Sequence, residues 1–181
     1  LNQLGFDVIG ADLSENSIAE ASNFSNETLH FKVHDMREPF EEKYDAIFNL
    51  FTSFGYFEND DDNLTTLKAI KNSLTDYGFA VIDFMNVNQV IDTLVPEEVK
   101  TVDGIDFHLK RYVADGHIFK EIDFEDQGKK YHFTEKVKAL TLQDFEELME
   151  QAGIYLLEVF GDYKLKKFHK IESERLILFF K

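Results

Sequence analysis

Short runs of apolar residues recur along the chain and predict the strands of a sheet. Most of these runs are bounded by polar residues, which is typical of strands that a parallel sheet buries on both faces. Four strands are expected in the first half of the chain, at Gly5–Leu13, Leu29–Val33, Tyr44–Leu50 and Phe79–Met85. Two more are expected near its end, at Ile154–Phe160 and Arg175–Phe180. The polar stretch between these last two shows no helical stripe, so we expect a loop to join them as antiparallel neighbours.

Apolar residues spaced three and four apart predict helices between the strands. The expected helices cover 15–22, 64–74, 87–94 and 142–152. Ser14 is placed to cap the first helix, and Thr141 with Asp144 resembles a capping box for the last. Gly78 follows the second helix, at a position where glycine commonly ends one.

The pattern changes after the third helix and predicts an antiparallel insert over 97–138. Asp115-Gly116 is a strong hairpin signal, because the two-residue turn needs residues that tolerate positive φ. A turn there sets Val113 opposite Ile118 on an apolar face. The same register sets basic residues opposite acidic residues on the other face. A third strand is expected at Lys130–Ala139.

One position on the apolar face of this hairpin is anomalous. The register sets Arg111 opposite Lys120, and like charges directly across a strand pair are unfavourable. Two explanations are open. Either an acidic residue of the main domain lies between the two cations, or this face covers the active site and Arg111 meets an anionic acceptor.

Composition narrows the classes of function. At 181 residues with 44% hydrophobic residues, the chain suits one domain with a sizeable core. The absence of cysteine excludes disulfides and thiolate metal sites. A net charge of −16 repels phosphate backbones and anionic membranes, and no run approaches the roughly 18 apolar residues of a membrane span. From this charge and these short runs we expect neither nucleic acid nor membrane as a partner. The histidines show no metal-binding spacing, so we expect no bound metal.

The working site is expected at Asn49–Tyr56. The strand at Tyr44–Leu50 breaks there into a loop that carries the aromatic residues Phe54, Tyr56 and Phe57. Loops at the carboxyl ends of parallel strands are where open α/β sheets bind ligands. The alternative is that these aromatic rings only plug the end of the core.

Five phrases carry a resemblance to a known family, namely GFDVIGADLS, HDMREPF, YDAIFNLFTSFGYF, YLLEVFGDYKLKKF and ERLILFF. In this order and spacing, the chain resembles the class I S-adenosylmethionine-dependent methyltransferases from their second strand onward. The resemblance implies a Rossmann-like α/β core, formed by 1–96 and 139–181, with a mostly parallel sheet and an antiparallel last strand. The insert, 97–138, would cover the active site. A cytoplasmic enzyme is implied, which transfers a methyl group from S-adenosylmethionine to a small-molecule acceptor.

The resemblance also implies roles for individual residues. Asp12 would accept both ribose hydroxyls of the cofactor, and Asp35 would accept the adenine amino group. Tyr56 is the candidate catalytic residue, since it would position the acceptor, and Phe54 and Arg111 are further candidate acceptor contacts. The full set of expected cofactor contacts lies at strand ends and consists of Asp12, Leu13, Asp35, Met36, Asn49, Leu50 and Phe51. Methyl transfer demands little acid–base chemistry, because the sulfonium carries its own leaving group and the protein mainly aligns the acceptor and excludes water.

The family's first strand and its glycine-rich turn have no counterpart in this sequence. By resemblance, that strand would lie at the centre of the sheet, between the strands that begin at Phe6 and Tyr44. We therefore expect an incomplete copy of the family's unit, in which these 181 residues bind the cofactor weakly or not at all. Two other functions stay open. One is a non-catalytic binding domain on the same scaffold, and the other is an NAD-type Rossmann oxidoreductase, which would need further parallel βαβ units in place of the insert.

Overall fold

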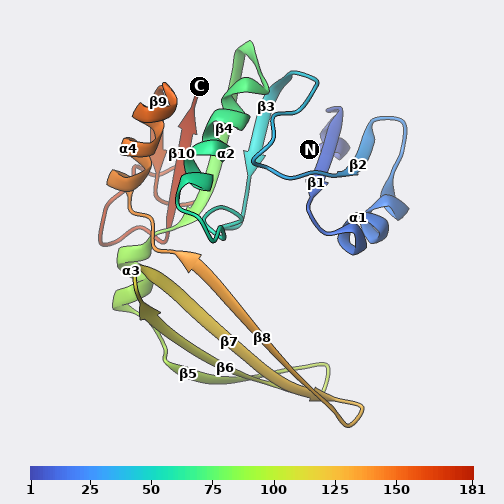
Figure 1. Ribbon diagram of the computed structural model, residues 1–181, viewed down its shortest axis with the longest axis vertical. Helices are drawn as coiled ribbons and strands as arrows, with labels where there is room; N and C mark the ends of the chain where they lie inside the picture. The colour runs from blue at the N-terminus through green and yellow to red at the C-terminus, as the bar shows by residue number, and fades with distance from the viewer.

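The computed structural model describes residues 1–181, and the chain forms three parts (Figure 1). The first part is an N-terminal unit of two short 3₁₀ turns, η1 (Asn2–Leu4) and η2 (Ser22–Phe24), with β1 (Val8–Asp12), α1 (Glu15–Ala21) and β2 (Leu29–Val33). The second is a four-stranded main sheet in the order β3 (Tyr44–Asn49), β4 (Leu74–Met85), β10 (Arg175–Phe180) and β9 (Leu156–Phe160). It packs with α2 (Asp61–Asn72) and α4 (Leu142–Ala152).

The third part is a four-stranded antiparallel insert that projects below the main sheet in Figure 1. Helix α3 (Val87–Asp92) leads into it. Its strands follow chain order, β5 (Glu97–Val102), β6 (Ile105–Ala114), β7 (His117–Asp126) and β8 (Lys129–Lys138). The predicted hairpin is confirmed, since Val113 pairs with Ile118 around the Asp115-Gly116 turn. Strand β5 was not predicted.

Strand directions agree with the Rossmann-like expectation. The pairs β1–β2 and β3–β4 are parallel, whereas β10 is antiparallel to both β4 and β9. The antiparallel closing pair is therefore confirmed. The mostly parallel sheet is divided, however, because β1 pairs only with β2 and β3 pairs only with β4. The division falls between β1 and β3.

Helix α4 shows how local sequence builds the core. Thr141 and Asp144 form the predicted capping box, with the Thr141 amide donating to Asp144 Oδ2 at 2.7 Å. The apolar stripe that follows buries Phe145 and Met149 against the core. Gly153 then ends the helix in the left-handed conformation, with φ 66°.

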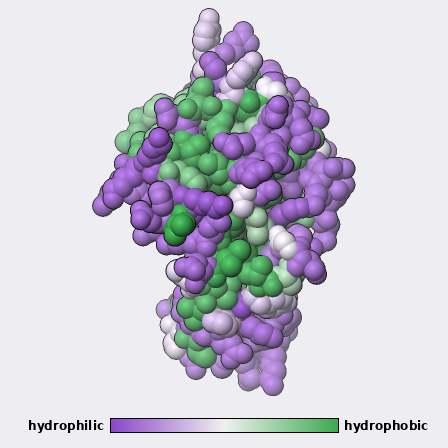
Figure 2. Space-filling model, turned by 90° about the vertical axis from the view of Figure 1, so that its left-hand side faces the viewer, coloured by the Kyte–Doolittle hydropathy of each residue, from purple (hydrophilic) through white to green (hydrophobic).

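The main core lies between the sheet and the helices α2 and α4, and it continues into the insert. Phe54, Phe84 and Phe145 are fully buried in it, and Ile118 and Val137 from the base of the insert belong to the same cluster. From the side of α3 and α4, hydrophobic side chains extend from the upper body across the junction onto the insert (Figure 2). No helix is long and apolar enough to cross a membrane.

Two sequence-based expectations, one about a helix end and one about strand burial, are corrected. Gly78 does not end a helix, because α2 stops at Asn72 and Gly78 lies inside β4. A Cβ there would lie 2.8 Å from the carbonyl oxygen of Tyr44, so glycine is needed for close approach of β3 and β4. Strands β1 and β3 were expected to be buried on both faces, but no residue of either strand is fully buried.

Candidate functional site

The predicted cofactor residues lie at the carboxyl ends of β1, β2 and β3. Figure 1 shows β3 running toward the insert, so the loop that follows it lies at the junction of the main sheet and the insert. Because β1 and β2 are parallel, Asp12 and the Asp35-Met36 pair leave their strands at the same edge.

Asp12 is held by a local turn that leaves one oxygen free. Its Oδ1 accepts a hydrogen bond from the Ser14 amide at 2.8 Å, and Ser14 in turn caps α1 by accepting from the Ser17 amide at 3.2 Å. The Asp12 side chain is exposed and no protein group donates to its Oδ2. The carboxylate is therefore oriented and still available to a ligand.

Asp35 is already engaged by a protein cation. Arg37 Nε lies 3.0 Å from Asp35 Oδ1, and the Arg37 guanidinium also contacts Oδ2. Hydrogen bonds from the Arg37 side chain, followed by one from its backbone amide, lower the pKa of Asp35 to about 2. Arg37 Nη1 also donates to Asp62 at the start of α2, at 2.9 Å. Arg37 thus occupies both oxygens of Asp35, and this pairing was not predicted from the sequence.

Asn49 links the ends of β2 and β3 and carries an unsatisfied polar atom. Its Nδ2 lies 3.8 Å from Met36 Sδ, so the structure brings these two predicted residues together. Asn49 Oδ1 is buried and has no hydrogen-bond partner in the protein. A buried carbonyl oxygen without a donor is unfavourable, so Asn49 is an exception among the buried polar groups of the chain.

Three predicted apolar contacts stand exposed at these strand ends. The exposed fraction is 67% for Leu13, 37% for Leu50 and 76% for Phe51. Exposed apolar side chains that gather near free polar groups are typical of a binding surface.

The aromatic loop after β3 divides into core and surface residues. Phe54 is 0% exposed and packs against Phe145 at a centroid distance of 5.4 Å. The prediction that Phe54 contacts the acceptor is therefore corrected, because the ring plugs the end of the core. Tyr56 is instead 47% exposed. Partial burial, and then the negative charge of Glu135, raise the pKa of Tyr56, so its hydroxyl stays protonated near neutral pH.

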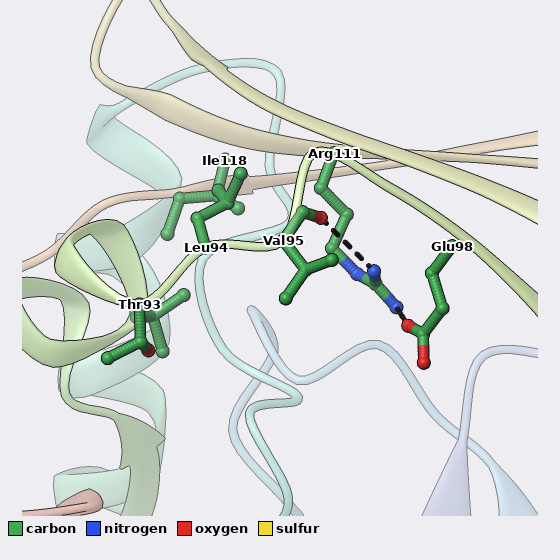
Figure 3. A pocket seen from close by; sticks show the side chains of 7 residues that line it. Thr93, Leu94, Val95, Glu98, Arg111 and Ile118 are labelled. Carbon is green, nitrogen blue, oxygen red and sulfur yellow. Dashed lines mark hydrogen bonds and ion pairs between the residues drawn. The ribbon is translucent and has the colours of Figure 1, made fainter.

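Arg111 lines a cavity of about 240 Å³ between α3 and the insert (Figure 3). The cavity walls are mostly apolar and include Val90, Leu94, Val95 and Ile118. Figure 3 shows the guanidinium beside Val95 and turned toward Glu98, and Nη2 lies 3.0 Å from Glu98 Oε2.

The like-charge pair in the hairpin is compensated from within the insert. Glu98 of β5 pairs with Arg111, and Glu135 of β8 lies 3.2 Å from Lys120. The expectation that a main-domain acid separates the two cations is therefore wrong. The neighbouring strands supply the acids, and the partner of Arg111 could not be foreseen because β5, which carries Glu98, was not predicted.

Comparison with solved structures places this arrangement in a known fold. A S-adenosylmethionine-dependent methyltransferase from Clostridium acetobutylicum superposes with a TM-score of 0.84 at 22% identity, over 96% of this chain and 74% of that chain. The chain has the class I methyltransferase fold. The CcbJ methyltransferase from Streptomyces caelestis superposes with a TM-score of 0.82 at 14% identity, over 99% of this chain and 76% of that one. CalS10, an amino pentose methyltransferase from Micromonospora echinaspora, superposes with a TM-score of 0.70 at 14% identity, over 96% of this chain and 72% of that one. By sequence, no protein-family model and no curated protein matches.

Three residues at this edge of the methyltransferase fold were missed by the sequence analysis. They are Asp83 near the end of β4, Tyr163 in the loop between β9 and β10, and Arg175 at the start of β10, and they form one hydrogen-bonded group. A signal was present, because Asp83 interrupts the apolar run FAVIDFM and Arg175 opens the apolar run RLILFF. A charge in such a run is rarely buried unless it is paired.

Proposed function

We propose that this chain forms the cofactor-binding edge of an S-adenosylmethionine-dependent methyltransferase that acts on a small-molecule acceptor. The observation that supports this most directly is the convergence of Asp12, Met36 and Asn49 at adjoining strand ends of a methyltransferase fold. The fold alone does not select the ligand, but the polar groups that these side chains leave unbonded narrow its chemistry.

The unbonded groups suit an adenosine-bearing sulfonium. The free Oδ2 of Asp12 can accept from ribose hydroxyls, and the unpaired Oδ1 of Asn49 can accept from a ligand N–H or O–H. The exposed Phe51 ring offers a π face to a cationic sulfur. Asp35 fits less well as an adenine contact, since Arg37 already occupies both of its oxygens. When bound, S-adenosylmethionine would supply an electrophilic methyl group together with its leaving group.

Tyr56 and Arg111 are the proposed acceptor contacts. A protonated Tyr56 can hydrogen-bond an acceptor and orient it, but it is a poor base. The cavity beside Arg111, about 240 Å³, is smaller than the site of a typical small-molecule ligand. Such sites start at roughly 300 Å³, so this cavity would enclose only part of the acceptor. CalS10 acts on an amino pentose, and we propose a polar acceptor of similar size here.

The test uses Asp12→Asn in the full-length protein. Asparagine keeps the Oδ1 that accepts from Ser14, but it replaces the free carboxylate oxygen with an NH₂ group. We expect S-adenosylhomocysteine, measured by titration calorimetry, to bind at least about tenfold more weakly, because hydrogen bonds to a charged group are lost. Asp7→Asn is the matched control, since Asp7 is exposed at the other end of β1 and its side chain makes no hydrogen bond.

The outcomes separate the competing functions. Label transferred from isotopically labelled S-adenosylmethionine to a small-molecule acceptor supports the proposal. Binding without transfer to any acceptor in a panel of amino and hydroxy sugars supports the non-catalytic alternative. If the wild-type protein binds NAD and not S-adenosylhomocysteine, the oxidoreductase reading replaces the proposal.

A further inference from the structure

Asp83 is a buried charge with no part in the donor and acceptor contacts described above. It lies on β4, two residues before the strand ends, and its side chain is only 2% exposed. A buried carboxylate is unfavourable unless charged or polar partners surround it. Its partners come from segments that are 32, 80 and 92 residues away in the chain.

These partners tie Asp83 to the loop that follows β3. Asp83 Oδ1 pairs with Arg175 Nε at 2.7 Å, and Oδ2 accepts from the Phe51 amide at 2.9 Å and from the Tyr163 hydroxyl at 3.0 Å. The Asp83 carbonyl oxygen accepts from the Thr52 amide at 2.9 Å. Arg175 Nη2 completes the group by donating to Thr52 Oγ1 at 3.0 Å. Both residues of the turn are thus bound through the main chain.

The turn itself is in a conformation that it would not adopt freely. Phe51 and Thr52 are consecutive non-glycine residues with φ values of 58° and 61°. The left-handed region crowds Cβ against the backbone, and it is least favourable for a β-branched residue such as threonine. Such conformations persist where the surrounding structure over-determines them. The hydrogen bonds from both amides to Asp83 supply that restraint.

The turn carries an aromatic ring that packing does not hold in place. Phe51 is 76% exposed and forms no aromatic pair, so the position of its ring depends on the backbone beneath it. We propose that Asp83, together with Arg175 and Tyr163, is a positioning group that fixes the Phe51–Thr52 turn for binding of the methyl donor. This inference rests on the proposed function. Its physical basis is preorganisation, since a turn that is already ordered loses less entropy when a ligand binds.

The sharpest test is Tyr163→Phe. The substitution keeps the ring and removes one donor to Asp83 Oδ2. In the wild type the Tyr163 hydroxyl stays protonated and can donate, because burial and the nearby Asp83 raise its pKa. We expect S-adenosylhomocysteine to bind about five- to tenfold more weakly, which corresponds to the net free energy of about one hydrogen bond. Amide exchange at Phe51 in the ligand-free protein should also become faster. In steady-state kinetics, KM for the donor should rise while KM for the acceptor stays unchanged.

A control and a second variant keep the outcomes distinct. Tyr77→Phe removes a hydroxyl from a residue that is 99% exposed on the same strand as Asp83, and it should change neither affinity nor exchange. Asp83→Asn should weaken binding further than Tyr163→Phe, and if it does not fold, Tyr163→Phe still decides the question. Equal affinity of Tyr163→Phe and wild type for S-adenosylhomocysteine overturns the positioning role alone. Failure of the full-length wild-type protein to bind S-adenosylhomocysteine overturns the proposed function and the positioning role with it.

Discussion

Asp12 and Asp35 both follow a strand, but their carboxylates differ in what already binds them. Asp12 accepts one local hydrogen bond from Ser14 and keeps an oxygen free, whereas Arg37 contacts both oxygens of Asp35. Opposite charge and hydrogen bonding to the ionised form stabilise the Asp35 carboxylate. At the scale of single residues, Asp12 is therefore available to a ligand, and Asp35 mainly ties the end of β2 to the start of α2 through Arg37.

Removing Arg37 should change how stability depends on pH. The folded pKa of Asp35, about 2, lies below its ordinary value of 3.8, so the ion pair stabilises the fold above pH 4. This contribution is lost as pH falls from about 4 through 2. In Arg37→Gln we expect the Asp35 pKa to rise toward 3.8, and the melting temperatures of variant and wild type to converge near pH 2. Carboxyl NMR titration and thermal melts from pH 2 to 6 measure both effects.

Lys68→Gln is the charge-matched control for this prediction. It removes one positive charge from an exposed side chain that has no ion-pair partner, so its difference from wild type should not vary over the same pH range. If Lys68→Gln and Arg37→Gln show the same pH dependence, net charge rather than the Asp35 pair is responsible. The ion pair is partly exposed, so its contribution at neutral pH should be small.

The strand-end acids could be predicted from sequence because short apolar runs place them locally. Their partners could not all be predicted in the same way. Arg37 is only two residues from Asp35, but nothing in the phrase HDMREPF says whether Asp35 faces a cation or a ligand. The Asp83–Arg175 pair depends on two strands that are neighbours in the sheet and 92 residues apart in the chain. Single-sequence periodicity carries no information on such a pair.

At the scale of elements, prediction succeeded where local chemistry determines the outcome. The Asp115-Gly116 turn fixes the register of β6 and β7, and Thr141 with Asp144 fixes the start of α4. Strand β5 was missed because its sequence, EEVKTV, does not alternate, and only its pairing with β6 identifies it. Helix α2 was extended too far because Leu74 fits its stripe, although Leu74 belongs to β4.

The two side-chain helix caps should differ in their effect on global stability. Thr141→Ala removes the hydroxyl of a capping box on α4, which buries Phe145 and Met149, and we expect a loss of about 1 kcal/mol in the free energy of unfolding. Ser14→Ala removes a comparable cap from α1, which has no buried residue, so it should fray α1 with a smaller global effect. Urea denaturation followed by far-UV circular dichroism compares the two variants. Equal losses would show that α1 unfolds together with the core.

At the scale of the whole molecule, the insert is joined to the loop that carries the site. Ile118 and Val137 extend the main core into the base of the insert. Next to them, the Lys138 amide donates to the Gly55 carbonyl oxygen at 2.8 Å, and the Lys138 ammonium pairs with Asp60. Since Gly55 precedes Tyr56, the proposed acceptor contact on the loop and Arg111 on the insert are held in one continuous packing unit.

This continuity predicts that the insert and the main sheet unfold together. Val137 is 5% exposed within the shared core, so Val137→Ala removes buried methyl groups and leaves a cavity, at a cost of about 2 kcal/mol. Val113→Ala is the matched control, because Val113 lies on the same sheet opposite Ile118 but is 43% exposed, and its cost should stay below about 1 kcal/mol. Hydrogen exchange in urea should show the amides of β7 and of α4 losing protection in one transition, shifted equally in Val137→Ala. If the β7 amides exchange at lower urea than those of α4, the insert is an independent unit, and the core at its base does not hold Arg111 in position relative to Tyr56.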